Sequence, residues 1–161
     1  MVRLLIVCLG NICRSPIAHG VLRERIAARG LDSRVSVDSC GTSSYHNGEQ
    51  ADPNTRRVAA RRGVDIEWHR SRQLLDSDFY EFEVLIAMDG SNEADIRDRL
   101  PPNSDVVIRR YMEFVPGAPG PDMPDPYYGG ASGFERVQDF VEAGADPLID
   151  WALTLAADGS S

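Results

Sequence analysis

Residues 8–15 read C-L-G-N-I-C-R-S and directly follow an apolar run at residues 4–7. The apolar run is typical of a buried parallel strand, and Pro16 suits the first turn of a helix. The segment between them therefore predicts a tight loop that joins a strand to a helix. Such a loop points backbone N–H groups inward at the positive end of a helix dipole, where an anion binds.

Two side chains of this loop are of types that take part in reactions. They are Cys8 and Arg14, with five residues between them. Arg14 has a planar guanidinium that can grip two oxygens of a phosphate at once. The positive cradle favours the thiolate form of a cysteine beneath that phosphate. The loop therefore predicts attack of sulfur on phosphorus. This reaction needs an acid to protonate the leaving oxygen, and the segment D-P-Y-Y-G-G at residues 125–130 offers Asp125, with Asp122 as a rival.

Composition excludes several classes of protein. A length of 161 residues fits one domain, which we expect to span residues 1–161. The net charge of -8 disfavours a partner that is nucleic acid or an anionic membrane.

No apolar stretch reaches transmembrane length, and the amino terminus lacks the pattern of a secretion signal. Three cysteines, an odd number, argue against a disulfide framework, so we expect a cytoplasmic protein.

The same residues disfavour a metal ion or a nucleotide cofactor. Cys8 and Cys13 have no second cysteine or histidine pair at ligand spacing, and the remaining cysteine and histidines are scattered singly. The loop lacks the Gly-Lys-Ser/Thr ending of a nucleotide-binding loop. We therefore expect no metal and no cofactor.

Strand patterns alternate with helix patterns along the chain, which predicts an α/β fold with a mainly parallel sheet. The predicted strands cover residues 2–7, 35–39, 84–88 and 106–108, and the predicted helices cover residues 16–29, 55–62, 91–100 and 134–155. Gly144 and Pro147 interrupt the last helix, where Asp146 could cap a new one. Residues 112–132, rich in proline and glycine, predict a long functional loop.

Ligands of such folds bind outside the carboxyl ends of the strands. Cys8, Ser39 and Asp89 each end a predicted strand, so we expect them to gather on one rim of the sheet.

Together, C-L-G-N-I-C-R-S-P near the amino terminus and D-P-Y-Y-G near residue 125 resemble the two signatures of the low-molecular-weight protein tyrosine phosphatases. The first motif is long, and its occurrence together with the distant acid loop is specific to this family. The resemblance covers nearly the whole chain. It implies a single-domain, four-stranded parallel sheet flanked by helices on both faces. It also implies a phosphocysteine intermediate on Cys8, Arg14 as the phosphate clamp, and Asp125 as general acid and then base.

The resemblance assigns further residues around the phosphate. It implies that Asn11 has a left-handed backbone held by Ser39, that Ser15 donates to the thiolate, and that His69 supports that serine from behind. Asp89 and Asn92 match a segment that buttresses the rim. The remaining residues expected to contact phosphate or substrate are Leu9, Gly10, Ile12, Cys13, Tyr45, Tyr127 and Tyr128.

Several of these side chains also have ordinary structural interpretations. Cys13 is either a packing residue or a redox partner of Cys8, and Cys40 is expected in the core. Asp125 could simply start a turn before Pro126. His69 could be a satisfied buried histidine, and we expect His19 to face solvent from its helix.

The predicted function is hydrolysis of phosphotyrosine in tyrosine-phosphorylated proteins, with inorganic phosphate as product, by a monomer that is open to redox regulation. One alternative is a protein-arginine phosphatase with an altered pocket wall. Ile12 favours a phenyl ring there, because it offers only apolar contact. Arsenate reductase would need two further cysteines, and Asp125 would have no use in it. A phosphate-binding module without turnover is disfavoured by the intact set of Cys8, Arg14 and Asp125.

Overall fold

The computed structural model describes the backbone of residues 1–158 and the side chains of these residues other than 128, 131, 157 and 158. The strands are β1 (Val2–Cys8), β2 (Val35–Gly41), β3 (Val84–Ala87) and β4 (Val107–Arg110). The helices are α1 (Arg14–Ala28), α2 (Pro53–Arg61), α3 (Asp78–Glu81), α4 (Gly90–Arg99) and α5 (Ala131–Asp158), and the short 3-10 helices are η1 (Tyr111–Phe114) and η2 (Pro126–Gly129).

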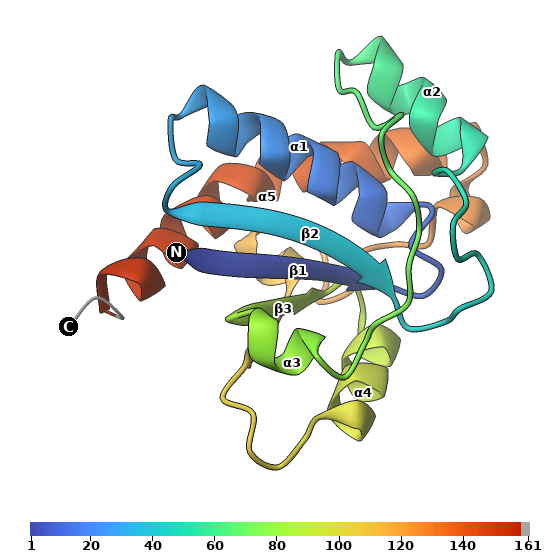
Figure 1. The fold of residues 1–161 in the computed structure, drawn as a ribbon. Coiled ribbons are helices and arrows are strands. Elements are labelled where there is room, and N and C mark those ends of the chain that lie inside the picture. The colour runs from blue at the N-terminus through green and yellow to red at the C-terminus, as the bar shows by residue number, and fades with distance from the viewer. Residues whose placement is uncertain (159–161) are drawn as a thin grey trace.

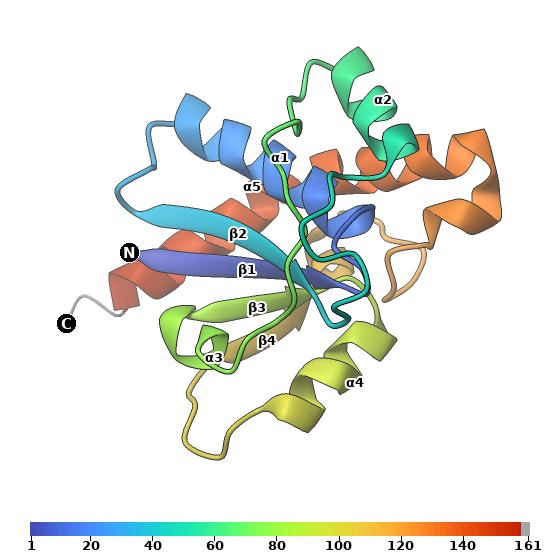
Figure 2. The same ribbon diagram turned by 45° about the vertical axis from the view of Figure 1, so that its right-hand side comes forward.

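The four strands form one parallel sheet in the order β2-β1-β3-β4. Helices α1 and α5 cover one face of the sheet, with α2 packed beside them, and α3 and α4 lie on the other face (Figures 1 and 2). The predicted four-stranded parallel sheet with helices on both faces is confirmed. The carboxyl ends of the strands lie at the edge where β1 runs into α1.

The core lies on both sides of β1, because successive side chains of a strand point to opposite faces. Leu4 and Ile6 pack under α1 and α5, whereas Leu5 and Val7 pack towards Phe79 and the residues near α4. These four side chains in the middle of β1 are fully buried. This two-sided burial explains why the strand is a nearly continuous apolar run and why its end is held firmly in place.

The final helix is continuous, so the predicted interruption by Gly144 and Pro147 is wrong. A proline inside a helix costs about 3 kcal/mol, because it removes one hydrogen bond and crowds the preceding turn. Burial of an apolar stripe on the same helix offsets this cost, since each large side chain contributes roughly 1.5–3 kcal/mol. The stripe consists of Val141, Ala145, Leu148, Ile149 and Ala152.

Tertiary contacts also account for the two polar signals near this proline. A Cβ at Gly144 would lie 2.9 Å from the ring of Tyr111, so the glycine allows close packing and does not end the helix. Asp146 forms ion pairs with Arg25 of α1 and with Arg29, which directly follows α1, instead of capping a new helix.

Two other differences from the sequence predictions are small. Helix α3, a single turn, was not predicted, and the loop at residues 112–132 contains η1 and η2. None of the helices in the described part of the chain has the length and apolar character needed to cross a membrane.

Candidate active site

The loop between β1 and α1 curls back on the end of the sheet. Asn11 has φ 57°, a left-handed conformation that asparagine tolerates better than most residues. The neighbouring strand β2 ends at Gly41, where a Cβ would lie 2.6 Å from the Leu9 carbonyl oxygen. Only a residue without a side chain fits there, so Gly41 lets the loop pack directly against β2.

Cys8 lies at the bottom of this loop and is almost fully buried. The backbone N–H of Asn11 donates to the Cys8 sulfur at 3.2 Å, and the Ser15 hydroxyl lies 2.9 Å from it. Asn11 Nδ2 donates to the Ser15 oxygen at 2.8 Å, which leaves the serine proton available for the sulfur. Donors to sulfur at the start of a helix stabilise negative charge on that sulfur.

Asn11 is the centre of the polar network beneath the loop. Its side-chain amide also donates to Ser39 at 3.1 Å, and its side-chain oxygen accepts from the backbone N–H of Arg72 at 3.1 Å. The predicted contact between Asn11 and Ser39 is present. Because Asn11 is fully buried with every polar atom engaged, its left-handed backbone is held in one geometry.

The two buried histidines differ from their predicted positions. His69 donates from Nε2 to the Asn11 carbonyl at 2.7 Å, so it supports the asparagine and not Ser15 as we had expected. His19 is only 7% exposed and places Nδ1 2.9 Å from the Ser39 hydroxyl, so the expectation that it faces solvent is wrong. Burial lowers the pKa of His69 and lowers that of His19 to about 4.

Arg14 is the first residue of α1 and is held by groups from two other segments. Its Nη1 donates to Asp89 at 2.7 Å and to the Met123 carbonyl at 3.0 Å. Asp89 in turn forms a capping box with Asn92 at the start of α4. Among the residues that the structure describes, the hydrogen bonds of Arg14 use Nη1 alone, which leaves Nε and Nη2 to face a ligand. Asp89 and Asn92 therefore buttress the rim.

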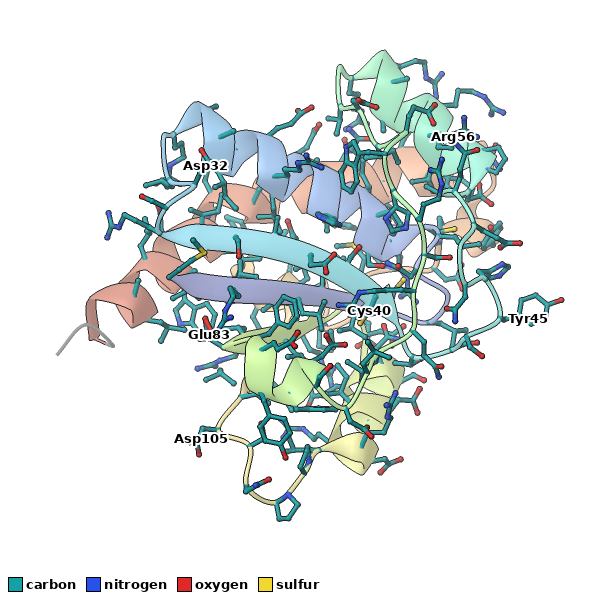
Figure 3. All side chains as sticks on the ribbon, in the orientation of Figure 1. Asp32, Cys40, Tyr45, Arg56, Glu83 and Asp105 are labelled. Carbon is teal, nitrogen blue, oxygen red and sulfur yellow. The ribbon has the colours of Figure 1, made fainter. Side chains whose placement is uncertain are left out.

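A pocket of about 400 Å³ opens above the loop. Its wall contains the loop, the segment after β2 and the start of η2: Cys8, Leu9, Gly10, Ile12, Cys13, Arg14, Ser43, Tyr45, His46, Asp125, Pro126 and Tyr127. Tyr45 is 85% exposed and points away from the body of the protein (Figure 3). The side chain of Tyr128 lies outside the described part of the structure. The described residues contain no group of three or more side chains able to hold a metal ion.

Asp125, not Asp122, lines the pocket. One Asp125 oxygen accepts from the backbone N–H of Tyr127 at 2.9 Å and caps η2, whereas Asp122 pairs with Arg110 outside the pocket. A Cβ at Gly133 would lie 2.2 Å from the Pro126 carbonyl oxygen, so the start of α5 approaches η2 closely. This contact holds the loop that carries Asp125.

The other two cysteines are buried thiols. Burial raises the pKa of Cys13 to about 12, and it raises the pKa of Cys40 well above its ordinary value. Cys40 lies in the core, as predicted. Cys13 donates to the Tyr127 hydroxyl at 3.3 Å.

Sequence reasoning missed Asp52, His46 and Met123, which touch the site from distant segments. Of these, only Asp52 had a local signal, because an aspartate before Pro53 is typical of a helix N-cap.

Known proteins share both the sequence and the fold. A family model described as low molecular weight phosphotyrosine protein phosphatase matches residues 3–159. A low molecular weight protein-tyrosine-phosphatase from Streptomyces coelicolor is 39% identical over 150 residues, which cover 91% of each chain. A crystal structure of a protein tyrosine phosphatase from Entamoeba histolytica is 41% identical, with a TM-score of 0.87 over 93% of this chain and 96% of that one.

A Drosophila arginine phosphatase is more distant. It is 26% identical with a TM-score of 0.83, covering 91% of this chain and 95% of that one. The match over residues 3–159 and the identity with the curated relative establish the family. The chain belongs to the low molecular weight phosphotyrosine protein phosphatases, a family of hydrolases.

Proposed function

We propose that residues 1–161 form a protein tyrosine phosphatase that hydrolyses phosphotyrosine through a phosphocysteine intermediate on Cys8. The observation that carries this proposal is one pocket that brings together the buried Cys8 sulfur, the Arg14 guanidinium and Asp125. Family membership supports the reaction class. We expect the protein to act as a monomer on tyrosine-phosphorylated proteins, with inorganic phosphate as the product.

In the first step the Cys8 thiolate attacks phosphorus, so that an S–P bond forms while the P–O bond to the tyrosine breaks. Asp125 gives its proton to the departing phenolate oxygen. The loop N–H groups and the free Nε and Nη2 of Arg14 bind the three equatorial oxygens, where charge accumulates. Asp89 and Met123 hold the guanidinium in place, so little reorganisation is needed during the reaction.

In the second step water attacks phosphorus and the S–P bond breaks. Asp125, now a carboxylate, accepts a proton from the water, and Cys8 leaves as a thiolate. The hydrogen bonds from Asn11 and Ser15 stabilise the sulfur as it regains its charge. The same donors therefore serve both the attacking and the departing thiolate.

Hydrolysis of phosphoarginine is the second candidate, because an arginine phosphatase shares the fold at 26% identity. The phosphate cradle binds either dianion, so the pocket wall must distinguish the two. Ile12, Tyr45 and Pro126 on this wall offer mainly apolar surface. A phenyl ring needs only such contact, whereas a buried guanidinium without hydrogen-bond partners loses about 1–3 kcal/mol.

The test is to measure kcat/KM on three matched peptides that carry phosphotyrosine, phosphoarginine or phosphoserine at one position. We expect phosphotyrosine to be preferred over phosphoarginine by about ten- to a hundredfold. Phosphoserine should be the poorest substrate, because its short side chain does not reach Cys8 from a peptide backbone. A higher constant for phosphoarginine would reverse the assignment, and no turnover of any peptide would reject phosphatase activity.

A further inference from the structure

Asp52 connects three segments that meet at the site. It is the N-cap residue of α2, where one carboxylate oxygen accepts from the Asn54 N–H at 2.8 Å. Its backbone N–H donates to the Ile12 carbonyl, in the loop after β1, at 2.7 Å. Its second carboxylate oxygen accepts a hydrogen bond from the hydroxyl of Tyr127. One residue thus contacts the phosphate loop, α2 and the segment that carries the acid.

The directions of these hydrogen bonds are fixed by chemistry. A carboxylate has only acceptors, so the Tyr127 hydroxyl donates its single proton to Asp52. The hydroxyl oxygen then accepts from the Cys13 thiol at 3.3 Å. Burial raises the pKa of Cys13 to about 12, so this thiol keeps its proton at neutral pH. Although more than half of Tyr127 is exposed, burial of its hydroxyl end and the bond to Asp52 raise its pKa as well.

Tyr127 lies two residues after Asp125 and fixes the position of that carboxyl. The Tyr127 N–H binds an Asp125 oxygen at 2.9 Å, and the Tyr127 ring packs edge-on against Phe134 with a centroid distance of 5.5 Å. The hydroxyl is the end of this side chain that reaches across to α2. If it loses Asp52, the short helix η2 keeps its packing on Phe134, the contact at Gly133 and the hydrogen bond from Ser132 to the Gly129 carbonyl, but it loses this link to α2.

We propose that Asp52 is a positioning residue for the general acid, acting on Asp125 through the Tyr127 hydroxyl. The proposal deepens the phosphatase function above and rests on it. Asp52 itself contributes no proton. It holds η2 at a fixed distance from the loop that carries Cys8, because the same residue binds Ile12. A general acid acts only when it lies within hydrogen-bond reach of the leaving oxygen.

The test compares phenyl phosphate, whose leaving group needs a proton, with p-nitrophenyl phosphate, whose leaving group needs one far less. Asp52→Ser keeps a good helix cap but is too short to reach Tyr127. Tyr127→Phe removes only the hydroxyl. General acid catalysis contributes about 10²–10⁴-fold, so we expect each variant to lower kcat/KM on phenyl phosphate about tenfold and to change kcat/KM on p-nitrophenyl phosphate less than about threefold. We compare kcat/KM because it reports the first step, whereas the hydrolysis of the phosphocysteine is common to both esters.

The double variant provides the decisive comparison. If both residues act through one hydrogen bond, Asp52→Ser combined with Tyr127→Phe should lose no more than either single variant. Asp65→Ser is the matched control, because Asp65 also caps a turn through its side chain but lies outside the pocket, and it should keep the parental ratio. Equal losses on the two esters, or additive losses in the double variant, would overturn the proposal.

A measurement that does not need catalysis separates this proposal from the proposed function. Hydrogen exchange at the Tyr127 amide should be faster by about tenfold in Asp52→Ser than in the parent, with thermal melting used to verify that the variant is folded. Unchanged exchange in a folded Asp52→Ser protein would overturn the positioning role even if the phosphatase is active. Faster exchange in a protein without phosphatase activity would support the link and reject only the function.

Discussion

His19 should make the protein sensitive to mild acid. Its pKa is about 4 in the fold, against an ordinary value of 6.5, with burial as the main cause. The groups that face it are Asp38, which raises the pKa, and His69 and Arg23, which lower it. Trp68 packs edge-on against the ring at 4.6 Å. Asn11 donates to Ser39, so the Ser39 proton is free for Nδ1 of a neutral His19.

The sign and size of the effect follow from this difference. Between pH 6.5 and pH 4 the unfolded chain binds a proton at His19 and the folded protein does not, so stability falls as the pH falls through this window. The loss amounts to about 2 kcal/mol at pH 5 and approaches about 3 kcal/mol at lower pH. Protonation would also turn Nδ1 into a donor and disturb the hydrogen bonds that lead through Ser39 and Asn11 to Ser15.

The assay is urea unfolding of the parent and of His19→Asn at pH 7.5 and pH 5. Asparagine offers an acceptor oxygen close to the Nδ1 position and does not titrate. The difference in unfolding free energy between the two pH values should be smaller in His19→Asn by about 2 kcal/mol. Carboxylates away from His19 affect both proteins alike, so they cancel in this comparison, whereas the interactions of His19 with Asp38 and His69 are part of the difference measured. The same pH dependence in the two proteins would refute the reasoning.

Three further results are expected. Arg14→Ala should lower kcat by about a hundredfold or more and weaken phosphate binding, because it removes donors to the transition state; stopped-flow assays and phosphate inhibition would measure both. Asp125→Asn should lower kcat/KM about 10²–10⁴-fold with phenyl phosphate and much less with p-nitrophenyl phosphate, whose leaving group hardly needs a proton; equal losses of kcat/KM would contradict its role as acid. If Cys13 captures oxidised Cys8 as a disulfide, Cys13→Ser should recover less activity than the parent when thiol is added after peroxide, and equal recovery would leave Cys13 a packing residue.

The sequence predicted those parts of the fold that depend on local pattern. The apolar run before Cys8 reports burial on both faces, and the helix after Arg14 follows from Pro16 and the helical spacing of apolar residues. The last helix was predicted less well, because local signals at Gly144 and Pro147 favour a break. Packing against Tyr111 and α1 outweighs these signals, and no local window contains that information.

In the candidate site, too, the residues of local motifs were predicted better than the contacts between distant segments. The two motifs predicted most of the residues that line the pocket, including Cys8 and Asp125, because each motif is a continuous stretch of sequence. They did not predict Ser43 and His46, which lie outside both motifs. The supporting contacts were predicted less well. His19 was expected at the surface because a single histidine on a helix has no pattern that reports its burial. Its partner Ser39 lies on β2, 20 residues away, and the packing of α1 on β2 brings the two together.

The most direct test of the account is to identify the atom that carries phosphate during turnover. The protein is mixed with p-nitrophenyl phosphate, quenched in denaturant and digested with trypsin, which cuts after Arg3 and Arg14. Mass spectrometry with fragmentation then distinguishes phosphate on Cys8 from phosphate on Cys13 in the peptide of residues 4–14. We predict phosphate on Cys8 in the parent and in Cys13→Ser, with no phosphopeptide and no turnover in Cys8→Ser. Turnover that persists in Cys8→Ser, or phosphate found only on another residue, would contradict the account.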